Sequence, residues 1–396
     1  MTQLTQSFWD LLSRSRILSD ERCWQARGAN PGLDGLAAAR KLVADGVLTK
    51  FQAEEILNGR WRRLRVGDFV LRDILGYGGM GTAYVAVNRA TREMVAIKLL
   101  GEQHKHDAGM RARFQMEGRA GMELIHPNLV RTLELGVIQD LYGETDFMVM
   151  DLFPGVTLLE GIFFSGGPLK PDAACDVIVQ AAAGLGYLHH NQMIHRDVKP
   201  DNILIDAEGN VKLLDFGLTL ADKSSNEDEF SLSMIFGHDC LGTADYIPPE
   251  QAVDSFHVDC RADVYSLGCT LFVALTGKRP FPFQRRIDTI RAHQSAPRPR
   301  IDAFNPAVPT EIVDYAQRMM AVNASDRPRD MSEVITFLTP FARRRRWAFS
   351  FRDVLATRRK RGAQKLAQQS KPGGTQATRP TDVVARVETD TPRLPD

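Results

Sequence analysis

The sequence predicts an α+β fold of two lobes, in which a small lobe of antiparallel strands is followed by a large, mainly helical lobe. From Phe69 onward, short apolar runs (FVLRDIL, TAYVAV and MVAIKLL) surround a glycine cluster, which is typical of antiparallel hairpins and not of a βαβ unit. Beyond about Ala173, runs such as DVIVQAAAGLGYLHH repeat at helical spacing. Strands that precede helices along one chain indicate that sheet and helices form separate layers.

The composition is that of a globular protein. Of the 396 residues, 43% are hydrophobic and 25% are charged, and the formal net charge of +1 indicates neither an acidic nor a nucleic-acid partner. The five cysteines form no C-x-x-C pair, so we predict free thiols in a reducing cytoplasm and neither a disulfide framework nor a zinc site. The N-terminal apolar patch lacks a basic segment before it, and no run reaches about 18 apolar residues, so we expect neither a signal peptide nor a membrane span.

Two attachments flank the two-lobed domain. Apolar residues recur near helical spacing within residues 1–62, which predicts a small helical module, and the basic strip Arg60–Arg65 would be its linker. The module contains no glycine loop, nucleophile or metal-ligand set, so we expect it to serve protein contact, including self-association.

Residues 343–396 carry 14 Lys and Arg against 5 Asp and Glu, which leaves a net charge of −8 on the rest of the chain. We predict that this basic tail is largely disordered.

A glycine cluster forms the first candidate site. Gly76, Gly78 and Gly81 match the pattern G-x-G-x-x-G, which occurs in dinucleotide-binding folds and in loops that cover phosphates. A second β run follows the cluster where a dinucleotide fold needs a helix, so the phosphate-covering loop is favoured. The backbone N–H groups of such a loop can approach phosphate oxygens because no side chains intervene. A plain turn between strands is the alternative for this cluster taken alone.

A lysine in an apolar strand forms the second candidate site. Lys98 follows Val95, Ala96 and Ile97 and comes 17 residues after Gly81. Lysine is rarely buried without an anionic partner, and the α- and β-phosphates of a nucleotide would supply one. Glu117, on a predicted helix, is placed to hold this lysine by an ion pair. A surface lysine and a surface glutamate are the alternative.

The third candidate site is the segment His195–Asn202 (HRDVKPDN), which matches H-R-D-x-K-x-x-N at every defined position. Asp215-Phe216-Gly217 follows 13 residues after Asn202. Together with the glycine cluster and the strand lysine, these motifs resemble a eukaryotic-type (Hanks-type) serine/threonine protein kinase of the kind found in bacteria. The resemblance covers residues 69–338 and implies a bilobal protein-kinase-like fold. It also implies transfer of the ATP γ-phosphate to a serine or threonine hydroxyl of a protein.

The resemblance assigns roles to the polar residues of these motifs. Asp197 would accept or orient the substrate hydroxyl proton, and Lys199 would neutralise the γ-phosphate during transfer. Asn202 and Asp215 would chelate Mg²⁺, with Mn²⁺ as an alternative, because hard cations take oxygen ligands. Lys98 would position the phosphates of ATP and would be held by Glu117.

The resemblance also implies a nucleotide pocket and a structural frame. Met150 would be the gatekeeper of the adenine site. The nucleotide-contacting residues would be Leu75, Gly76, Gly78, Gly79, Gly81, Ala83, Ala96, Lys98, Asp151 and Phe153. In the frame, Glu250 would pair with Arg327, and Asp263 would brace the catalytic loop through its backbone. These three would serve stability more than catalysis.

The segment between Asp215 and Glu250 resembles an activation segment. We expect it to be regulated by autophosphorylation, because added phosphate could pair with Arg196 of the catalytic loop and order the segment. The candidate acceptors are Ser224, Ser225, Ser231 and Ser233. We expect Thr243 to shape the substrate hydroxyl site instead. A plain solvated loop is the alternative.

The sequence departs from the family pattern at two neighbouring places. Gly121 stands four residues after Glu117, where the family has a bulky apolar residue, and Thr132 replaces an apolar residue on the next strand. We therefore expect an empty place beside a loosely held helix. A pseudokinase-type interaction scaffold and a small-molecule phosphotransferase are the alternatives to an active protein kinase. Such scaffolds usually lose the strand lysine, the catalytic aspartate or the metal-binding aspartate, all of which this sequence has.

The basic tail has several candidate partners. Its basic residues are interleaved with Trp347, Phe349 and Phe351. This pattern fits an anionic membrane surface, an acidic protein partner, or the acidic body of the same chain, on whose large lobe the aromatic residues would anchor. A solvated arm is the alternative. The pattern predicts no specific nucleic-acid site.

Overall fold

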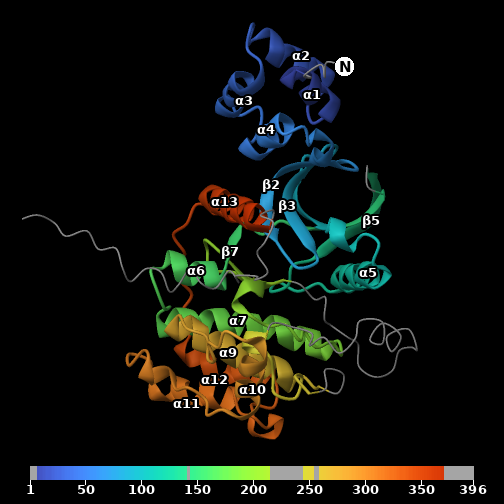
Figure 1. Ribbon diagram of the computed structural model, residues 1–396. Coiled ribbons are helices and arrows are strands. Elements are labelled where there is room, and N and C mark those ends of the chain that lie inside the picture. Colours follow the sequence, from blue (N-terminus) through green and yellow to red (C-terminus); the bar gives the residue numbers. More distant parts are fainter. Residues whose placement is uncertain (1–6, 141–142, 215–243, 254–257, 370–396) are drawn as a thin grey trace, which may run out of the picture.

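The computed structural model describes residues 7–140, 143–214, 244–253 and 258–369. A group of N-terminal helices, a sheet-based small lobe and a helical large lobe follow one another along the long axis of the molecule (Figure 1). The two-lobed α+β fold predicted from the sequence is confirmed. Among the described helices, none combines the length and the apolar character needed to cross a membrane.

The N-terminal module consists of four short helices, α1 (Phe8–Ser15), α2 (Asp20–Gly28), α3 (Gly35–Ala44) and α4 (Lys50–Leu57). A polar side chain caps the start of each helix; the caps are Ser7, Ser19, Asp34 and Thr49. Helices of this length are marginal by themselves, so their stability depends on packing. The predicted helical character of residues 1–62 is confirmed.

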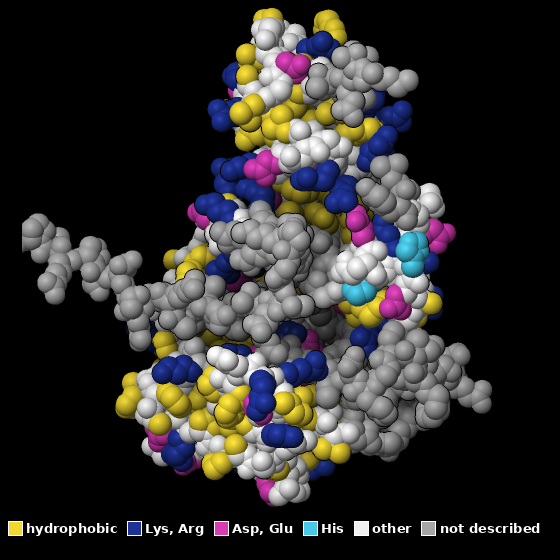
Figure 2. All heavy atoms as spheres, viewed as in Figure 1, with side chains coloured by type: hydrophobic (Ala, Val, Ile, Leu, Met, Phe, Trp, Pro, Cys, Tyr) yellow, Lys and Arg dark blue, Asp and Glu magenta, His cyan; other side chains and the backbone are white. Residues whose placement is uncertain are grey.

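The module shares its hydrophobic core with the small lobe. Gln52 of α4, 2% exposed, donates from Nε2 to the carbonyl of Leu71 at 2.8 Å. The ring of Phe51 lies 5.9 Å from that of Tyr84 between centroids. The 3-10 helix η1 (Trp61–Leu64) continues this junction, and on the face drawn in Figure 2 Lys and Arg side chains gather at its level. The module is therefore packed against the small lobe of its own chain.

The small lobe is built on a six-stranded antiparallel sheet with the order β1-β2-β3-β4-β6-β5. Its strands are β1 (Arg65–Val66), β2 (Phe69–Tyr77), β3 (Gly81–Asn88), β4 (Met94–Leu100), β5 (Thr132–Asp140) and β6 (Gly143–Asp151). The glycine cluster joins β2 to β3. The 3-10 helix η2 (Glu102–His104) and helix α5 (Ala108–Glu123) follow β4, and α5 packs against β5 (Figure 1).

The large lobe combines a small sheet with a bundle of helices. The sheet consists of β7 (Gly155–Thr157), β8 (Ile203–Asp206) and β9 (Val211–Leu213). The helices are α6 (Leu158–Phe164), α7 (Pro171–His190), α9 (Arg261–Thr276), α10 (Arg286–Ser295), α11 (Thr310–Met319) and α12 (Met331–Leu338). The 3-10 helices are η3 (Pro200–Asn202), η4 (Ala244–Tyr246), η5 (Ile301–Ala303), η6 (Ala324–Asp326) and η7 (Thr339–Phe341). Helix α9 is buried on all sides from its second residue onward, so it is the central core element of the lobe.

The C-terminal segment differs from the prediction of a largely disordered tail. Residues 343–350 run along the large lobe, and helix α13 (Phe351–Gln369) lies against β2 of the small lobe (Figure 1). The segment is ordered because its apolar and basic side chains have partners on the same chain: Val354 is 2% exposed, and Trp347 packs against the core of the large lobe. The intramolecular alternative is therefore confirmed for this part of the tail. Residues 370–396 lie outside the described residues.

Candidate active site

Strand β4 and helix α5 bring Lys98 and Glu117 together beneath the glycine cluster. Lys98 Nζ donates to Glu117 Oε1 at 2.8 Å, and the two side chains are 11% and 5% exposed. The predicted ion pair is confirmed. A charged pair this far from water needs good geometry to offset its desolvation, so α5 has to be held closely to the sheet.

Two glycines allow α5 to approach the sheet closely. A Cβ atom on Gly121 would collide with Oγ1 of Thr132, and one on Gly118 would collide with the side chain of Leu135. Gly118 and Gly121 are one helical turn apart and thus lie on the same face. The prediction of an empty place beside Gly121 is wrong, because β5 has moved into the space that a larger side chain would occupy.

Polar contacts attach the first half of α5 to β6. Asp146 is 1% exposed and accepts from Arg111 Nε and from Gln115 Nε2, both at 2.7 Å. Hydrogen bonds to a buried charged group are among the stronger contacts in proteins. These bonds and the glycine contacts hold the helix along its length, in contrast to the loosely held helix that we expected.

The glycine-rich loop is attached to the residues that follow β4. The N–H of Gly78 donates to the carbonyl of Gly81 at 2.8 Å, and the N–H of Gly101 donates to the carbonyl of Met80 at 2.8 Å. His104 Nε2 lies 3.0 Å from the carbonyl oxygen of Gly79. We did not predict a role for His104, because no local pattern connects it with a loop that lies 25 positions earlier in the chain.

The strands around this loop bring the predicted nucleotide-contacting residues to one part of the sheet. In the strand register Gly76 lies opposite Ala83, Ala83 lies opposite Lys98, and Ala96 lies opposite Met150. Leu75 directly precedes Gly76 on β2. Positions 83 and 96 are both alanine, so the side chain at each is a single methyl group.

The segment after β6 offers backbone groups for a ligand. The N–H of Asp151 donates to the carbonyl of Arg131 at 3.0 Å, and the carbonyl of Phe153 accepts from the N–H of Gly155 at 2.8 Å. The Phe153 N–H has no acceptor among the described residues, as its predicted contact with a nucleotide requires.

The catalytic loop brings its three predicted polar residues together. Lys199 Nζ donates to Asp197 Oδ2 at 2.5 Å, and the side chains of both residues are less than one-fifth exposed. Asn202 Nδ2 donates to the backbone carbonyl of Asp197 at 2.9 Å and to its Oδ2 at 3.1 Å. The carboxylate of Asp197 is thus held in one orientation by two neighbours.

Asp263 of α9 holds the catalytic loop from inside the large lobe. Its carboxylate accepts the N–H groups of His195 and Arg196, each at 2.9 Å, and lies 2.8 Å from His189 Nε2. Burial by itself would raise the pKa of Asp263, but the hydrogen bond from His189 and the contacts with His195 hold it below the ordinary value. The carboxylate therefore stays charged. The predicted brace is confirmed, whereas the part of His189 was not predicted.

The side-chain oxygen of Asn202 is the one predicted metal ligand that lies among the described residues. The two hydrogen bonds from Asn202 Nδ2 orient the side-chain amide, and no described residue donates to its oxygen Oδ1. The N–H of Leu214, the last described residue before Asp215, donates to the backbone carbonyl of Asn202 at 2.9 Å. Asp215 lies outside the described residues. Amide and carboxylate oxygens are the ligands that Mg²⁺ prefers.

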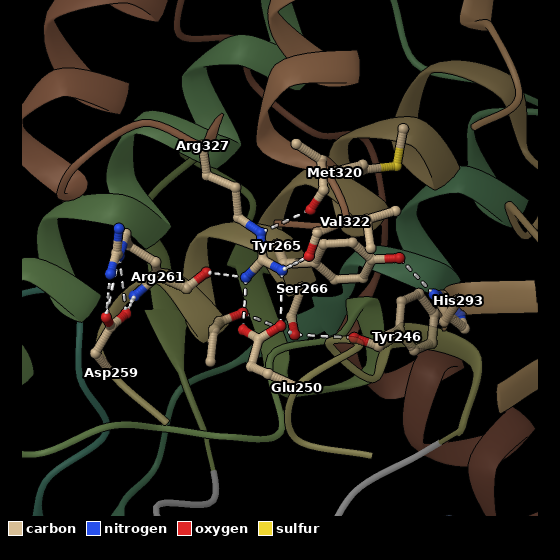
Figure 3. Close-up of polar contacts among 12 residues, drawn as sticks. Tyr246, Glu250, Asp259, Arg261, Tyr265, Ser266, His293, Met320, Val322 and Arg327 are labelled. Atoms are coloured by element: carbon tan, nitrogen blue, oxygen red, sulfur yellow. Dashed lines mark hydrogen bonds and ion pairs between the residues drawn. The ribbon is translucent and has the colours of Figure 1, made fainter. Parts of the chain in front are cut away.

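The frame of the large lobe contains the predicted ion pair between Glu250 and Arg327 (Figure 3). Arg327 Nη1 and Nη2 donate to the two carboxylate oxygens at 2.6 and 2.7 Å, and the guanidinium carbon lies 4.8 Å from the ring centroid of Tyr265. Ser266 Oγ donates to the carbonyl of Tyr246 at 2.9 Å. These contacts attach the segment around Glu250 to α9, and the prediction of the pair is confirmed.

The predicted phosphate acceptors of the activation segment all lie outside the described residues. These acceptors are Ser224, Ser225, Ser231 and Ser233. Thr243, which we expect to shape the substrate hydroxyl site, also lies outside the described residues.

Comparisons with known proteins agree with this geometry. The family profile described as "Protein kinase domain" matches residues 69–336. The serine/threonine-protein kinase PrkC of Bacillus subtilis is 34% identical over 256 residues, which are 65% of this chain and 36% of PrkC. The serine/threonine-protein kinase PknB of Mycobacterium tuberculosis is 38% identical over 213 residues, 54% of this chain and 33% of PknB. The chain thus spans about a third of the length of these relatives.

Proposed function

The chain belongs to the protein kinase domain family, and we propose that it transfers the γ-phosphate of ATP to serine or threonine hydroxyls of protein substrates. Membership of the family implies ATP and a divalent metal ion. One observation carries the proposal for this chain: Asp197, Lys199 and Asn202 contact one another within 3.1 Å, in the same molecule as an assembled Lys98–Glu117 pair.

In this proposal each residue acts by position and charge, since phosphoryl transfer requires little covalent chemistry from the protein. Asp197 orients the attacking hydroxyl and accepts its proton. Lys199, already beside that carboxylate, stabilises negative charge on the transferred group. Lys98 holds the phosphates that lie under the glycine-rich loop, with Glu117 fixing its ammonium group.

We propose Mg²⁺ as the metal, held by Asn202 and Asp215, with Mn²⁺ as an alternative. When bound there, the ion would supply positive charge beside the phosphates. We further propose regulation by autophosphorylation between Asp215 and Glu250, supported by the cluster of serines in that segment.

The partners and the location of the protein are also proposals. Protein contact through the N-terminal module, including self-association, is supported by Trp24 of α2, whose side chain is 77% exposed. An anionic membrane or an acidic partner is proposed for the exposed basic residues of the C-terminal segment, such as Arg346. The described cysteines, Cys23, Cys175, Cys260 and Cys269, are free thiols, which supports the cytoplasm as the location.

The test is metal-dependent transfer from γ-labelled ATP to casein and to the protein itself. The Asp197→Asn variant should lose transfer while it still binds ATP, because the neutral amide cannot accept the hydroxyl proton. Asp314→Asn, an exposed carboxylate on α11, is the matched control and should transfer at the wild-type rate. Wild-type protein that binds ATP with Mg²⁺ or Mn²⁺ but transfers no phosphate would instead support the scaffold alternative.

A further inference from the structure

The C-terminal segment is attached to the large lobe by backbone and side-chain contacts. The N–H of Trp347 donates to the carbonyl of Ala207 at 2.9 Å, and its indole ring lies against Gly161 of α6. The guanidinium of Arg345 pairs with the carboxylate of Asp172 at the start of α7. Residues 343–362, which we call the strap, therefore begin with a firm attachment to the large lobe.

Two consecutive arginines of α13 then bind different lobes. Arg358 donates to both carboxylate oxygens of Glu160 at 2.9 and 2.5 Å and to the carbonyl of Gly155 at 3.2 Å, and both acceptors belong to the large lobe. Arg359 donates to both carboxylate oxygens of Asp73 on β2, each at 2.8 Å. All four charged side chains are only 11–16% exposed. Removing one partner of an ion pair this well shielded costs more than removing one partner of a surface pair, because the remaining charge is left shielded and unpaired.

The outer edge of β2 is open to these contacts because the neighbouring strand is short. Strand β1 pairs only with Phe69 and Val70, at the start of β2. Within the part of the chain that the structure describes, no strand pairs with the rest of β2 on that side, and helices α4 and α13 contact it instead. Figure 1 shows α13 lying beside β2 and above β7 and α6. A helix that covers a strand edge in this way shields it from solvent.

The side chain of Tyr77 connects the strap with the glycine-rich loop. Tyr77 stands between the first two glycines of the loop, and a Cβ atom on Gly362 would collide with its ring. The same ring packs against the core shared by the N-terminal module and the small lobe. Burial raises the pKa of the Tyr77 hydroxyl, and Glu55 of the module and Arg359 of the strap are among the charges that act on it. Tyr77 thus lies where the module, the loop and the strap meet.

The docked strap accompanies an assembled nucleotide site. In the same structure Lys98 is bonded to Glu117 at 2.8 Å and the turn from Gly78 to Gly81 is closed by a 2.8 Å hydrogen bond. Strand register connects Tyr77 directly to this turn, because Tyr77 pairs with Thr82 on β3. A restraint on the Tyr77 ring is therefore a restraint on the turn that would cover the phosphates.

We infer that the strap is an intramolecular clamp that holds the glycine-rich loop in its nucleotide-binding position, with Arg359 and Gly362 acting as positioning residues through Asp73 and Tyr77. The inference rests on the proposed function, in which this loop covers ATP. Arg358 fixes the same helix to the large lobe, so the clamp also limits the opening of one lobe relative to the other. Fixing a loop in its bound arrangement strengthens binding because less conformational entropy is lost with the ligand.

The test compares full-length wild-type protein with Arg359→Glu and with Arg352→Glu, an exposed arginine of the same helix. Arg359→Glu should raise the KM for ATP about fivefold and change kcat less than about twofold, the size expected for one coupled contact. Hydrogen exchange of the backbone over residues 73–81 should become faster in the same variant. Arg352→Glu should match wild type in both measurements.

Two combined variants separate the clamp from a general loss of stability. Reversing the pair, with Arg359→Glu and Asp73→Arg together, should restore slow exchange and a low KM, because the ion pair is rebuilt with its charges exchanged. Gly362→Leu should raise the KM because the added side chain displaces the Tyr77 ring. In a Tyr77→Ala background the same Gly362→Leu change should add nothing.

An unchanged KM for ATP and unchanged hydrogen exchange in Arg359→Glu would overturn the inference. A lower KM would overturn it as well, because it would show that the strap hinders the binding of ATP. Failure of the charge reversal to restore either measurement would also overturn it. The exchange measurement needs no catalysis, so its outcome stands even if wild-type protein transfers no phosphate, which would contradict the proposed function alone.

Discussion

The catalytic loop and the glycine-rich loop are held in opposite ways. The catalytic loop is held from within, because Asp263 of the buried helix α9 accepts two of its backbone N–H groups. The glycine-rich loop is held from outside, by His104 after β4 and by Tyr77 between the N-terminal module and the strap. A loop held by the core keeps one geometry, whereas a loop held by peripheral segments can respond to whatever moves those segments.

The largest effect is expected where the inner support is removed. Asp263→Ala should lower the free energy of unfolding by about 4 kcal/mol, because it leaves His189 and two backbone N–H groups buried without their acceptor. Transfer should be lost with it, since the loop that carries Asp197 loses its brace. Chemical denaturation measures the first effect, with the exposed Asp302→Ala as control. A stability close to wild type would show that the catalytic loop is not held from within.

The Lys98→Met variant tests the role of this residue in phosphate transfer separately from any role in stability. The methionine fits the same space but carries no charge, so transfer should fall about a thousandfold while the fold is kept. Steady-state transfer from ATP and the thermal midpoint measure the two parts. Activity near the wild-type level in folded Lys98→Met protein would remove this residue from the site.

As the pH falls, the contribution of buried groups inside the large lobe to stability should be lost before that of the ion pairs of the strap. Burial lowers the pKa of His293, which packs beside Tyr265 of α9, from 6.5 to about 4. The unfolded chain therefore binds more protons between these values, and stability should fall by about 3 kcal/mol as the pH drops from about 6.5 to about 4. His293→Gln should flatten this part of the curve, and the exposed His190→Gln should not.

The ion pair between Arg358 of the strap and Glu160 of the large lobe should also be lost in acid, but at a lower pH than the contribution of His293. Burial alone would raise the pKa of Glu160, but its hydrogen bond with Arg358 lowers it below the ordinary value of 4.5. Its contribution is therefore complete above about pH 4.5 and is lost only as the pH falls through the lower folded value. Hydrogen exchange of α13 at pH 5.5 should match that at pH 7. The measured rates are first corrected for the intrinsic effect of pH on amide exchange. Faster corrected exchange of α13 at pH 5.5 than at pH 7 would contradict this order.

The smallest effect concerns the close approach of α5 to the sheet. Gly121→Ala should cost about 1–2 kcal/mol, because the added methyl group collides with Thr132 Oγ1 and outweighs the better helix propensity of alanine. Thr132→Ala combined with it should recover part of the loss, since Oγ1 is then absent. Denaturation of the single and double variants measures the coupling. An increase in stability from Gly121→Ala alone would show that the helix is held loosely, as the sequence suggested.

The sequence alone predicted the features that depend on residues close together along the chain, either within one short motif or repeated at a regular spacing. The alternating strands and the helical runs were predicted from their periodicity, and the roles of Asp197, Lys199 and Asn202 were assigned through the family resemblance of the short motif that contains them. The ion pair Lys98–Glu117, whose members are 19 positions apart, was predicted from a lysine in an apolar strand and a glutamate on a nearby predicted helix. The pair Glu250–Arg327, whose members are 77 positions apart, was predicted only through the family resemblance.

Only the tertiary structure decided how the flanking segments are used. The pattern of basic and aromatic residues after position 343 was compatible with a membrane, an acidic partner or the same chain, because charge composition does not specify a partner. Arg359 and Asp73 are 286 positions apart, and the contact of Gly362 with Tyr77 depends on where two folded lobes place the two ends of the strap. The same holds for Gly121, whose missing side chain could mean a cavity or a close approach, depending on whether β5 moves in to fill the space.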